Sequence, residues 1–483
     1  MDKQVVIIGA GLVGSLLSIY LARKGYKVSV YERRGDMRRM EVEAGRSINL
    51  ALSDRGIRAL EEVGIAKEVL SIAIPMHGRF IHNLDGSTAF QPYGKQGQYI
   101  NSVSRRDLNC KLMDLAEKEG IRFFFNHKCS HIDWKKNEVF FETITDERQP
   151  TTGEGTTGKG RPLTEETGGH QSSVIGHPPS GHRSSVVADL IFGSDGAYSA
   201  ARLSHMLQHD QFEYHQYYID CGYKELTIPA GPDGSFLLEK NALHIWPRKN
   251  YMLIALPNPD GSFTGTLFFP FHGQLSFEKL TEREQVDEFF ETTFPDVVPL
   301  IPDLPEQFFS HPTSSLVTVK CFPWIREDKF CLIGDAAHAI VPFFGQGMNA
   351  GFEDCSVLNT LMEKHGSDWT AILNEFQGLR KPDADAIADL AVNNFIEMRE
   401  KTADPKFLLQ KKIEARLHEH HPDKWIPAYS QVTFSPHIRY SEALRNSQRQ
   451  EAIMQEVMRN SDIEHNWDNP TVEEMILSRL GEV

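Results

Sequence analysis

The beginning of the chain alternates apolar and polar stretches in the order of a strand, a helix and a second strand. Val5–Ile8 is a short apolar run, which is typical of a buried parallel strand. Leu12–Lys24 has helical character and ends before Gly25, and Lys27–Tyr31 is again strand-like. These segments predict a βαβ unit at the start of the chain.

Further along, the pattern predicts a capped helix and three more strands. Ser104–Asp107 carries a capping-box signature, in which a serine side chain accepts a hydrogen bond from an N–H group of the first helical turn. Apolar, strand-like segments lie on its C-terminal side. They are Ile121–Phe125, Glu138–Thr143 and Val186–Phe192.

The second half of the chain changes character twice. Tyr214–Phe271 has alternating, aromatic-rich runs that predict an antiparallel sheet in a second domain. Lys329–Ile333 returns to the character of a buried parallel strand, and after Gly347 the pattern is helical almost to the end. Helix breaks are expected at Gly366, Pro382, Pro405 and residues 422–436.

The predicted fold class is therefore α/β, with an α+β second domain. A Rossmann-type nucleotide domain is expected from residues 1–75, 100–200 and 325–365. A substrate domain with an antiparallel sheet is expected from residues 76–99 and 201–324, followed by a helical C-terminal region at 366–483.

Asp146–Ser185 is rich in Gly, Thr, Ser and Pro and has little apolar surface to bury. This composition predicts a mobile surface insertion between two strands (146–185). Within it, Gly153–Gly158 matches the pattern G-x-G-x-x-G. Because no apolar strand runs into this stretch and no helix follows, we interpret the match as coincidental.

Composition narrows the function classes. Hydrophobic residues make up 40% and charged residues 24%, as in an ordinary soluble protein. The net charge of -15 argues against nucleic acid as the main partner. The six cysteines form no C-x-x-C pair, which favours reduced thiols and a cytoplasmic location.

Two segments suggest a membrane anchor or a metal site, and neither interpretation is favoured. Apolar Gln4–Ala22 fits strand, turn and helix better than a signal anchor, and no transmembrane tail is expected. His418–His421 lacks a spaced third ligand, so no metal site is expected.

A glycine fingerprint lies between the first predicted strand and helix. Gly9 would allow a tight turn, Gly11 a close approach of the backbone to a pyrophosphate, and Gly14 close packing of the helix. The N–H groups at the start of the helix would face the anion. This context, unlike that of Gly153–Gly158, predicts a dinucleotide site.

Glu32 ends the second strand and is placed to accept hydrogen bonds from ribose hydroxyls. A carboxylate there would repel a 2′-phosphate, so the nucleotide is FAD or NAD rather than NADP. The neighbouring Arg33 and Arg34 weaken this charge argument.

Two more segments follow predicted strands and bear on the cofactor. Gly193–Ser199 contains an Asp-Gly turn at Asp195, and Gly334–His338 contains Asp335, a carboxylate placed to hold a polyol hydroxyl. The helix expected from Gly347 would offer N–H groups to an anionic isoalloxazine edge. Each segment alone could be a plain Asp-Gly turn.

In order and context, the three segments resemble those of the FAD-dependent aromatic hydroxylases that have one nucleotide-binding domain. The resemblance implies FAD as cofactor and NADPH as co-substrate, with no separate NADPH domain. It extends to the branch of this family whose members hydroxylate kynurenine. The stretches that carry it are Gly45–Ser53, Gln98–Arg105, Leu243–Arg248, Ala255–Asn258, Gly351–Cys355 and Ile396–Arg399.

The resemblance also assigns roles to single residues. FAD contacts would fall on Gly9, Gly11, Val13, Gly14, Glu32, Arg34, Ala51, Arg105, Asp195, Asp335, Gly347, Met348 and Asn349. Substrate contacts would fall on Arg79, Tyr93, Asn394 and Tyr429, with Arg79 pairing with the amino-acid carboxylate. From spacing alone, Arg79 would be a surface arginine and the tyrosines packing residues.

The implied reaction is hydroxylation of L-kynurenine to 3-hydroxy-L-kynurenine with NADPH and O2 through a flavin C4a-hydroperoxide, a step of tryptophan degradation. No side chain is assigned a catalytic role, because the flavin carries the chemistry. Pro342–Gly347, with two phenylalanines, is expected to form a wall near the flavin. The eukaryotic members have an apolar membrane tail that is not expected here, and we expect a monomer or homodimer.

Other functions stay open from the sequence. The chain could be a related flavoprotein hydroxylase of another aromatic acid. A flavin-dependent reductase or halogenase uses the same nucleotide fold, but the halogenase signature Trp-x-Trp-x-x-Ile-Pro is missing from the sequence. A scaffold that kept the fold and lost catalysis is the non-enzymatic alternative.

Overall fold

The structure is a computed structural model that describes residues 3–40, 49–94, 97–144, 183–397, 405–460 and 462–481. Most of the insertion expected at 146–185, and the whole of Gly153–Gly158 within it, lie outside the described residues.

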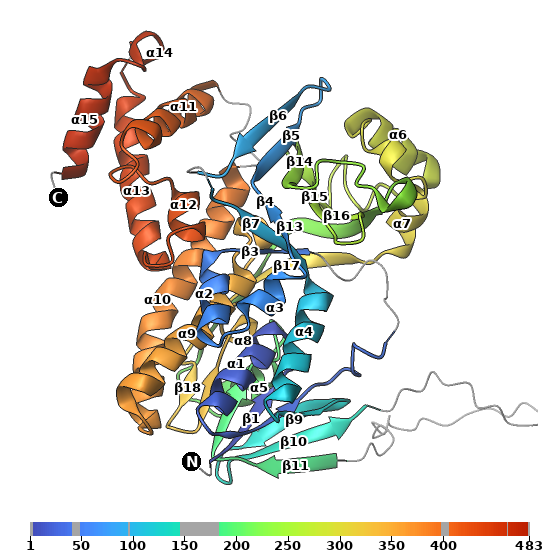
Figure 1. The fold of residues 1–483 in the computed structure, drawn as a ribbon, viewed down its shortest axis with the longest axis vertical. Helices are drawn as coiled ribbons and strands as arrows, with labels where there is room; N and C mark the ends of the chain where they lie inside the picture. Colours follow the sequence, from blue (N-terminus) through green and yellow to red (C-terminus); the bar gives the residue numbers. More distant parts are fainter. Residues whose placement is uncertain are drawn as a thin grey trace, which may run out of the picture.

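A six-stranded sheet forms the base of the molecule (Figure 1). Its strands are β1 (Gln4–Ile8), β2 (Lys27–Tyr31), β8 (Arg122–Phe124), β12 (Leu190–Gly193), β18 (Ile325–Arg326) and β19 (Phe330–Leu332). They lie in the order β18-β19-β12-β1-β2-β8. β1 is parallel to β2 on one side and to β12 on the other, and β12 is parallel to β19. Val5, Val6 and Ile7 have no exposed surface, so the apolar run that predicted β1 is the centre of this sheet.

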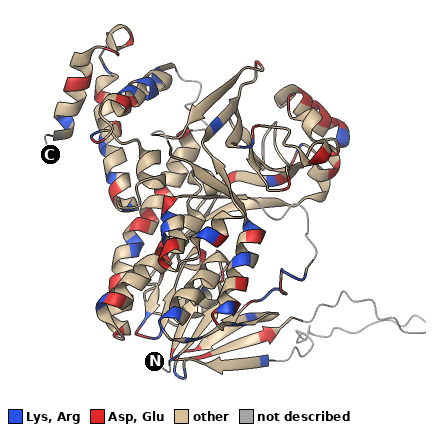
Figure 2. Cartoon of the chain, in the orientation of Figure 1, with Lys and Arg blue, Asp and Glu red and all other residues tan. Residues whose placement is uncertain are grey.

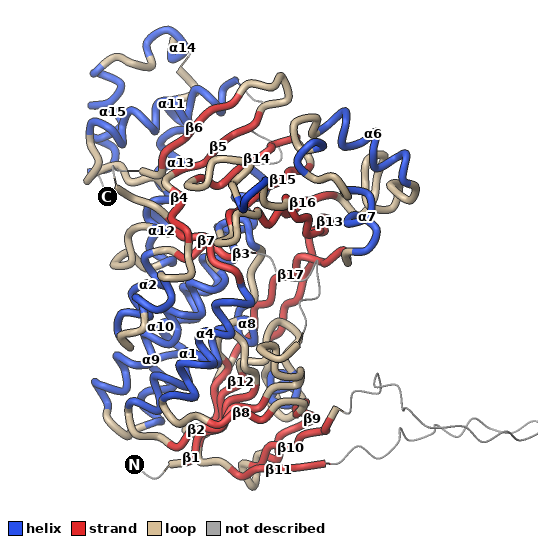
Figure 3. Tube along the Cα trace, turned by 45° about the vertical axis from the view of Figure 1, so that its right-hand side comes forward, coloured by secondary structure: helices blue, strands red, loops and turns tan. Residues whose placement is uncertain are grey.

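Helices cover this sheet and connect it to the rest of the chain. They are α1 (Leu12–Arg23), α2 (Asp54–Glu62), α3 (Ala66–Leu70), α4 (Arg105–Lys118), α5 (Ala200–Met206), α8 (Asp335–His338), α9 (Gly347–His365) and α10 (Trp369–Ile396). α1 packs between α4 and α9. The N-cap half of the expected capping box is confirmed at α4, where the hydroxyl of Ser104 accepts a hydrogen bond of 3.3 Å from the Asp107 N–H. Figure 3 shows α1, α2, α9 and α10 gathered on one side of the strands.

A seven-stranded sheet lies above the first. Its strands are β5 (Gly78–His82), β6 (Thr88–Pro92), β13 (Glu213–Ile228), β14 (Ala242–Arg248), β15 (Tyr251–Pro257), β16 (Phe263–Phe269) and β17 (Thr313–Phe322). All neighbours are antiparallel except β14 and β5, which are parallel. One face packs against α6 (Arg283–Thr293) and α7 (Leu304–Ser310) through an apolar cluster that includes Trp246 and Phe263. The predicted antiparallel sheet is confirmed, and with it the fold class.

The remaining strands in the described part of the chain form two three-stranded sheets. β3 (Asn49–Leu52), β7 (Ile100–Ser104) and β4 (Ile74–Met76) lie between the two large sheets, and β9 (His127–Asp133), β10 (Glu138–Thr143) and β11 (Arg183–Val187) lie at the base. The Ser102 hydroxyl donates a 2.9 Å hydrogen bond to the Pro257 carbonyl at the end of β15. The first small sheet therefore joins the nucleotide part to the seven-stranded sheet.

The C-terminal part is helical, as predicted, with short 3₁₀ turns elsewhere. Its helices are α11 (Pro405–His420), α12 (Ala428–Thr433), α13 (Tyr440–Val457), α14 (Ile463–Asn466) and α15 (Pro470–Gly481). The 3₁₀ turns are η1 (Pro232–Gly234), η2 (Val298–Leu300) and η3 (Pro342–Phe344). α13 packs on α10, and α12 packs on α13. Among the described helices, none combines the length and apolar character needed to cross a membrane.

Three expectations about single elements were wrong. Val186–Phe192 is not one strand, because the chain leaves β11 and enters β12 at Asp189, whose carboxylate accepts a 2.7 Å hydrogen bond from the Gln4 N–H. Pro382 does not break α10, since buried residues on both sides hold that helix by tertiary packing. Residues 183–185 are strand rather than insertion, because β11 pairs with β10 although its side chains are largely exposed.

Charged residues are spread over the molecule. Figure 2 shows Lys and Arg interspersed with Asp and Glu along the outer helices. The strands of each large sheet come from the segments expected for the corresponding domain. The domain boundaries themselves stay predictions.

Candidate functional site

The glycine fingerprint forms a tight turn between β1 and α1. Gly9 has φ of 106°, which favours glycine, and a Cβ there would lie 2.6 Å from the Ser194 carbonyl oxygen. A Cβ on Gly14 would lie 2.1 Å from the Gly9 carbonyl oxygen. In contrast, a Cβ on Gly11 would meet no described atom within 4 Å. The turn thus requires Gly9 and Gly14 for its own packing, while Gly11 borders open space that a ligand can fill.

The start of α1 can receive an anion and is fixed by the later segments of the site. Gly11 is the N-cap residue, and no described side chain caps this helix. Val13 packs against both later glycines: a Cβ at Gly334 would lie 3.0 Å from it, and one at Gly351 would lie 2.5 Å away. The fingerprint and the Asp335 segment are therefore in direct contact.

Glu32 is buried at the end of β2, and both of its oxygens are engaged. Oε2 accepts a 3.0 Å hydrogen bond from the Ala10 N–H within the glycine-rich turn. Oε1 accepts hydrogen bonds from the backbone N–H and from Nε of Arg34, at 3.0 and 2.9 Å. Besides its predicted contact with ribose, Glu32 therefore holds the turn itself, a role that spacing did not reveal.

Asp195 caps a helix. Its carboxylate accepts hydrogen bonds from the N–H groups of Ala200 at 2.7 Å and Ala201 at 3.2 Å, and from the Ser199 hydroxyl. Burial raises the pKa of Asp195, although these hydrogen bonds oppose the rise. Its side chain is committed to the start of α5.

Asp335 is different. It is half-buried in the first turn of α8, directly after Gly334, whose φ is 61°. Its carboxylate has no hydrogen-bond partner among the described residues. Arg105, the first residue of α4, is exposed and likewise forms no ion pair within the described part of the chain. Both side chains are free to bind a ligand, as the prediction for FAD requires.

Asn349 joins the first small sheet to the start of α9. Its Nδ2 donates to the Ala51 carbonyl at 2.9 Å, and its Oδ1 accepts a 3.0 Å hydrogen bond from the Ser53 N–H. The side chain has no exposed surface. Gly347 and Met348 form the first turn of α9, which no side chain of the described residues caps. Ala51, Gly347, Met348 and Asn349, four of the residues that the resemblance assigns to FAD binding, are thus brought together.

Arg79 lies on β5 against two tyrosine rings. Its guanidinium carbon is 4.4 Å from the ring centre of Tyr429 and 5.5 Å from that of Tyr93. Arg79 has no carboxylate partner among the described residues. Burial lowers its pKa, but the facing hydroxyls of Tyr429 and Tyr93 more than offset this and raise the pKa of Arg79. The site therefore holds an uncompensated cation.

Tyr93 presents a second hydrogen-bond donor. Its ring stacks on Tyr429, with centroids 5.6 Å apart and planes at 15°. Burial raises the pKa of Tyr93 well above its ordinary value, so the hydroxyl keeps its proton. This hydroxyl is buried and has no partner at hydrogen-bonding geometry among the described residues. A cation and an unused donor side by side are a suitable site for a carboxylate.

Asn394 lies on α10 and contacts η3. Its Nδ2 donates a 2.8 Å hydrogen bond to the Phe343 carbonyl in η3. The next residue, Phe344, stacks on Tyr429 with centroids 5.8 Å apart. Asn394 thus reaches the two tyrosines through η3, rather than by lying on the rings as Arg79 does.

The two phenylalanines that were expected to form one wall near the flavin pack against different groups. Phe344 faces Tyr429, whereas the Phe343 ring packs against Phe395 at 4.5 Å and Phe268 at 5.1 Å. Phe434 was not identified as a site residue from the sequence. Its ring centroid lies 6.0 Å from that of Tyr93 and 6.1 Å from that of Tyr429. No periodic signal marks Phe434, because it follows a short helix in a loop.

Comparison with known proteins identifies the family. The model of the family described as "FAD binding domain" matches residues 2–152 and 151–391. The kynurenine 3-monooxygenase of Flavobacterium johnsoniae is 50% identical over 478 residues, covering 99% of this chain and 98% of that protein. Those of Myxococcus xanthus and Sus scrofa are 46% and 43% identical, and the matches cover 99% and 93% of this chain and 95% and 88% of those proteins. The chain belongs to the kynurenine 3-monooxygenase family.

Solved structures agree on the fold. The tetrameric form of 2-methyl-3-hydroxypyridine-5-carboxylic acid oxygenase has a TM-score of 0.61 at 20% identity, covering 84% of this chain and 94% of that one. A single-residue variant of Klebsiella pneumoniae HpxO complexed with FAD has a TM-score of 0.61 at 17% identity, covering 99% of both chains. For a member of the kynurenine 3-monooxygenase family, the cofactor is FAD, as predicted. The open space at Gly11 and the free carboxylate of Asp335 fit this cofactor.

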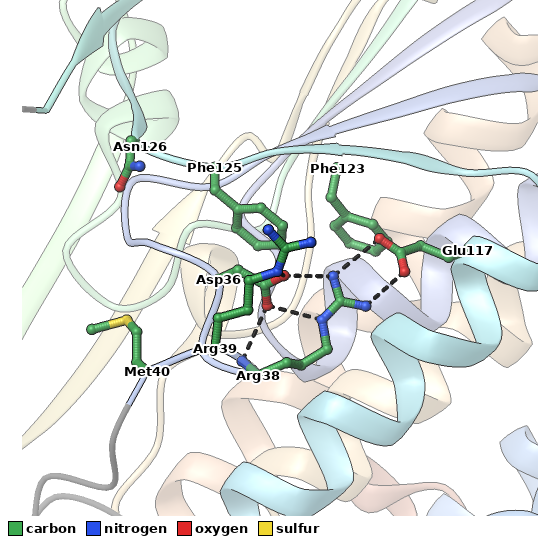
Figure 4. Close-up of a pocket in the computed structure, with 8 residues that line it drawn as sticks. All are labelled: Asp36, Arg38, Arg39, Met40, Glu117, Phe123, Phe125 and Asn126. Carbon is green, nitrogen blue, oxygen red and sulfur yellow. Dashed lines mark hydrogen bonds and ion pairs between the residues drawn. The ribbon is translucent and has the colours of Figure 1, made fainter.

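A hollow beside the nucleotide part does not belong to this site. It is lined by Asp36, Arg38, Arg39, Met40, Glu117, Phe123, Phe125 and Asn126, none of which is a predicted site residue. Figure 4 shows the Arg38 guanidinium between Asp36 and Glu117. Hydrogen bonds to Glu117 and Asp36 raise the pKa of Arg38, so its charge is compensated and is not available to a phosphate.

The histidines at 418–421 face protein groups. His420 contacts the carboxylate of Glu473 at 3.0 Å, and His421 lies 3.4 Å from it. His418 bonds to the Trp425 carbonyl instead. In this kynurenine 3-monooxygenase family member, the contacts of His420 and His421 with Glu473 join the C-terminal end of α11 to α15.

Proposed function

We propose that this protein is a monooxygenase that converts L-kynurenine to 3-hydroxy-L-kynurenine with FAD, NADPH and O2. The main structural support for kynurenine as the substrate is the pair formed by the uncompensated Arg79 cation and the unused Tyr93 hydroxyl. Kynurenine has an amino-acid carboxylate that both can bind and an aromatic ring that can stack in the same place.

The side chains have distinct tasks in this proposal. Arg79 and Tyr93 hold the carboxylate, and Tyr429 supports Arg79 through its ring face. Phe344 and Phe434 give the site apolar walls that exclude water from the reacting ring. Asn394 holds η3, and thereby Phe344, in place.

The cofactor would be held by the segments described above. Gly9–Gly14 would receive the pyrophosphate, Glu32 the ribose, and Asp335 the ribityl chain, with Asn349 fixing the start of α9. The chemistry that bound FAD supplies is acceptance of hydride from NADPH and transfer of one oxygen atom from O2 to the ring. Overall, kynurenine, NADPH, O2 and a proton give 3-hydroxykynurenine, NADP⁺ and water.

No protein base is needed for the substrate. The amino group on the ring of kynurenine already activates the neighbouring carbon toward an electrophilic oxygen. The protein therefore contributes binding, orientation and exclusion of water rather than proton abstraction.

The decisive experiment is mass spectrometry of the product after incubation of the flavin-loaded protein with L-kynurenine, NADPH and air. We expect a gain of one oxygen on kynurenine and equal consumption of NADPH. NADPH consumption that yields only hydrogen peroxide would refute kynurenine as the substrate. 4-Hydroxybenzoate is the matched control for a hydroxylase of another aromatic acid, and it should remain unchanged.

A further inference from the structure

Arg55 is a buried arginine that the predicted site does not use. It lies on α2 and has a fully covered side chain. Its guanidinium binds Oε1 of Glu353 on α9 at 2.7 Å and stacks on the Tyr440 ring at 4.1 Å. Glu353 is its one acidic partner within the described residues, so most of its donors are directed elsewhere.

Those donors hold the C-terminal end of α12. Nε donates to the Val432 carbonyl at 2.7 Å, and Nη2 donates to the Gln431 carbonyl at 3.3 Å. Nη2 also donates to the carbonyls of Ser435 and Ile438 in the segment that follows. The last carbonyls of a helix have no partner within it, and a cation at that end is favourable. Arg55 therefore caps α12.

This cap is significant because α12 has only six residues and carries Tyr429 in its first turn. So short a helix is unstable by itself and takes its position from tertiary contacts. Tyr429 must lie over Arg79 for the two rings and the cation to form one site. Any rotation of α12 about its long axis would move that ring away from the guanidinium.

Arg55 is also held on the side of the residues predicted to bind the flavin, at the start of α9. α2 follows directly after Ser53, whose N–H is bound by Asn349. Glu353 is also held by Nη1 of Arg380 at 2.6 Å, so the carboxylate that Arg55 binds is itself fixed. Tyr440, beneath Arg55, donates a 2.9 Å hydrogen bond to the Gln346 side chain just before α9.

We propose that Arg55 is a positioning residue that fixes α12 to the flavin-binding core and so places Tyr429 over Arg79. The assignment rests on the proposed function for its consequence on kynurenine binding. Arg55 touches neither substrate nor cofactor in this role, and its effect on the substrate passes through Tyr429.

The test compares Arg55→Lys with Arg58→Lys. Lysine keeps the charge at position 55. Its ammonium group cannot donate hydrogen bonds to a carboxylate and several carbonyls at once, as the planar guanidinium group does. Arg58 is a matched control, since it lies on the same helix with a side chain 56% exposed and pairs with Glu62 of that helix at 3.4 Å. Binding is measured by titrating L-kynurenine against the absorption spectrum of the bound flavin.

For Arg55→Lys we expect full flavin content, a kynurenine Kd raised about tenfold and a kcat within about twofold of the original. Arg58→Lys should match the original protein. In a Tyr429→Ala background, Arg55→Lys should add no further increase in Kd, because both changes act on the same contact. An unchanged Kd, or increases that multiply in the double variant, would overturn the assignment.

A second measurement does not depend on kynurenine. Amide hydrogen exchange over residues 428–438 should be faster in Arg55→Lys, while exchange in α1 and α4 stays unchanged. If Arg55→Lys fails to fold, Glu353→Gln weakens the hold on Arg55 while Arg380 keeps its bond to Asp354, and the same local increase is expected. Uniform exchange rates in both variants would reject the role of Arg55. Faster exchange without any kynurenine response in the original protein would instead reject the proposed substrate.

Discussion

The guanidinium of Arg79 lies 4.4 Å from the ring centre of Tyr429, although one residue belongs to an edge region of the seven-stranded sheet and the other to a short C-terminal helix. Nothing in the described part of the chain neutralises this arginine. A cation kept in place by aromatic rings, with no acidic partner, is suited to a ligand that brings its own negative charge.

Replacing Arg79 by methionine should therefore remove the carboxylate contact while keeping the apolar stem of the side chain. Leaving a bound carboxylate without its partner costs about 3–5 kcal/mol, or about 10²- to 5 × 10³-fold in kcat/KM for L-kynurenine. Steady-state kinetics test this. The amine analogue of kynurenine that lacks the carboxylate should react equally poorly with both proteins, and near-normal kynurenine kinetics in Arg79→Met would contradict the assignment.

Replacing Tyr93 by phenylalanine should weaken the binding of L-kynurenine without lowering the stability of the protein. The hydroxyl is buried without a partner in the described residues, so its removal should leave the melting temperature unchanged or slightly raised. A hydrogen bond to a charged group contributes about 1.5–3 kcal/mol, so Kd for L-kynurenine should rise roughly 10- to 100-fold. Calorimetry and flavin absorption titrations measure the two effects. A destabilised protein with unchanged binding would show that the hydroxyl serves the fold.

Gly11→Ala should fold and yet bind flavin weakly. No described atom lies within 4 Å of the added Cβ, and φ at Gly11 is -72°, which alanine adopts freely. The methyl group would occupy the space predicted for the pyrophosphate. Circular dichroism should match the original protein while the flavin absorption of the purified protein falls. Gly378→Ala in α10 is the matched control, because its Cβ also meets nothing and should raise stability by roughly 0.5–1 kcal/mol. Full flavin content in Gly11→Ala would place the pyrophosphate elsewhere.

Stability should fall below neutral pH because of His205. Burial lowers the pKa of His205 to about 4, and its ring lies among those of Trp134, Phe212 and Phe330. The unfolded chain takes up a proton near pH 6.5, whereas the folded chain does so only near pH 4. The free energy of unfolding is therefore fully retained above about pH 6.5 and decreases as the pH falls toward 4, by roughly 3 kcal/mol in all.

Urea unfolding at pH 7 and pH 4.5 measures this loss. His205→Phe should reduce the difference between the two pH values. Phe212→Leu, which removes a neighbouring ring without removing a titrating group, should lower stability equally at both. An unchanged difference in His205→Phe would assign the pH dependence to other groups.

Local pattern was enough for much of the fold and for the nucleotide turn. Val5–Ile8 and the spacing of Gly9 and Gly14 depend on neighbours in the chain, and sequence reasoning placed them correctly. Asp195 and Glu32 show the limit of this reasoning, because a residue expected to face a ligand can also cap a helix or hold a turn. The second role of Glu32 depends on a bond to Ala10 in another segment, and that of Asp195 depends on how the turn before α5 folds, so the spacing of residues reveals neither.

The Arg79 group could not be found from spacing. Its members come from β5, the residue after β6, α10 and α12, and no period relates these positions. Arg79 alone reads as a surface arginine, and the resemblance to a family supplied what the pattern could not. Pro382 shows the same effect in the fold, since packing around α10 overrides a local preference that predicts a break.

The pairing of β1 with β12 sets the order in which this protein can assemble during synthesis. β1 leaves the ribosome well before its partner on one side, residues 190–193, which follow roughly ten to forty seconds later at about 5–20 residues per second. β12 then requires residues 330–332 before its own second edge is covered. Until then the nascent chain exposes an unpaired apolar strand edge, so changes that weaken β12 or β19 should lower the yield of folded protein in cells more than they alter the finished molecule.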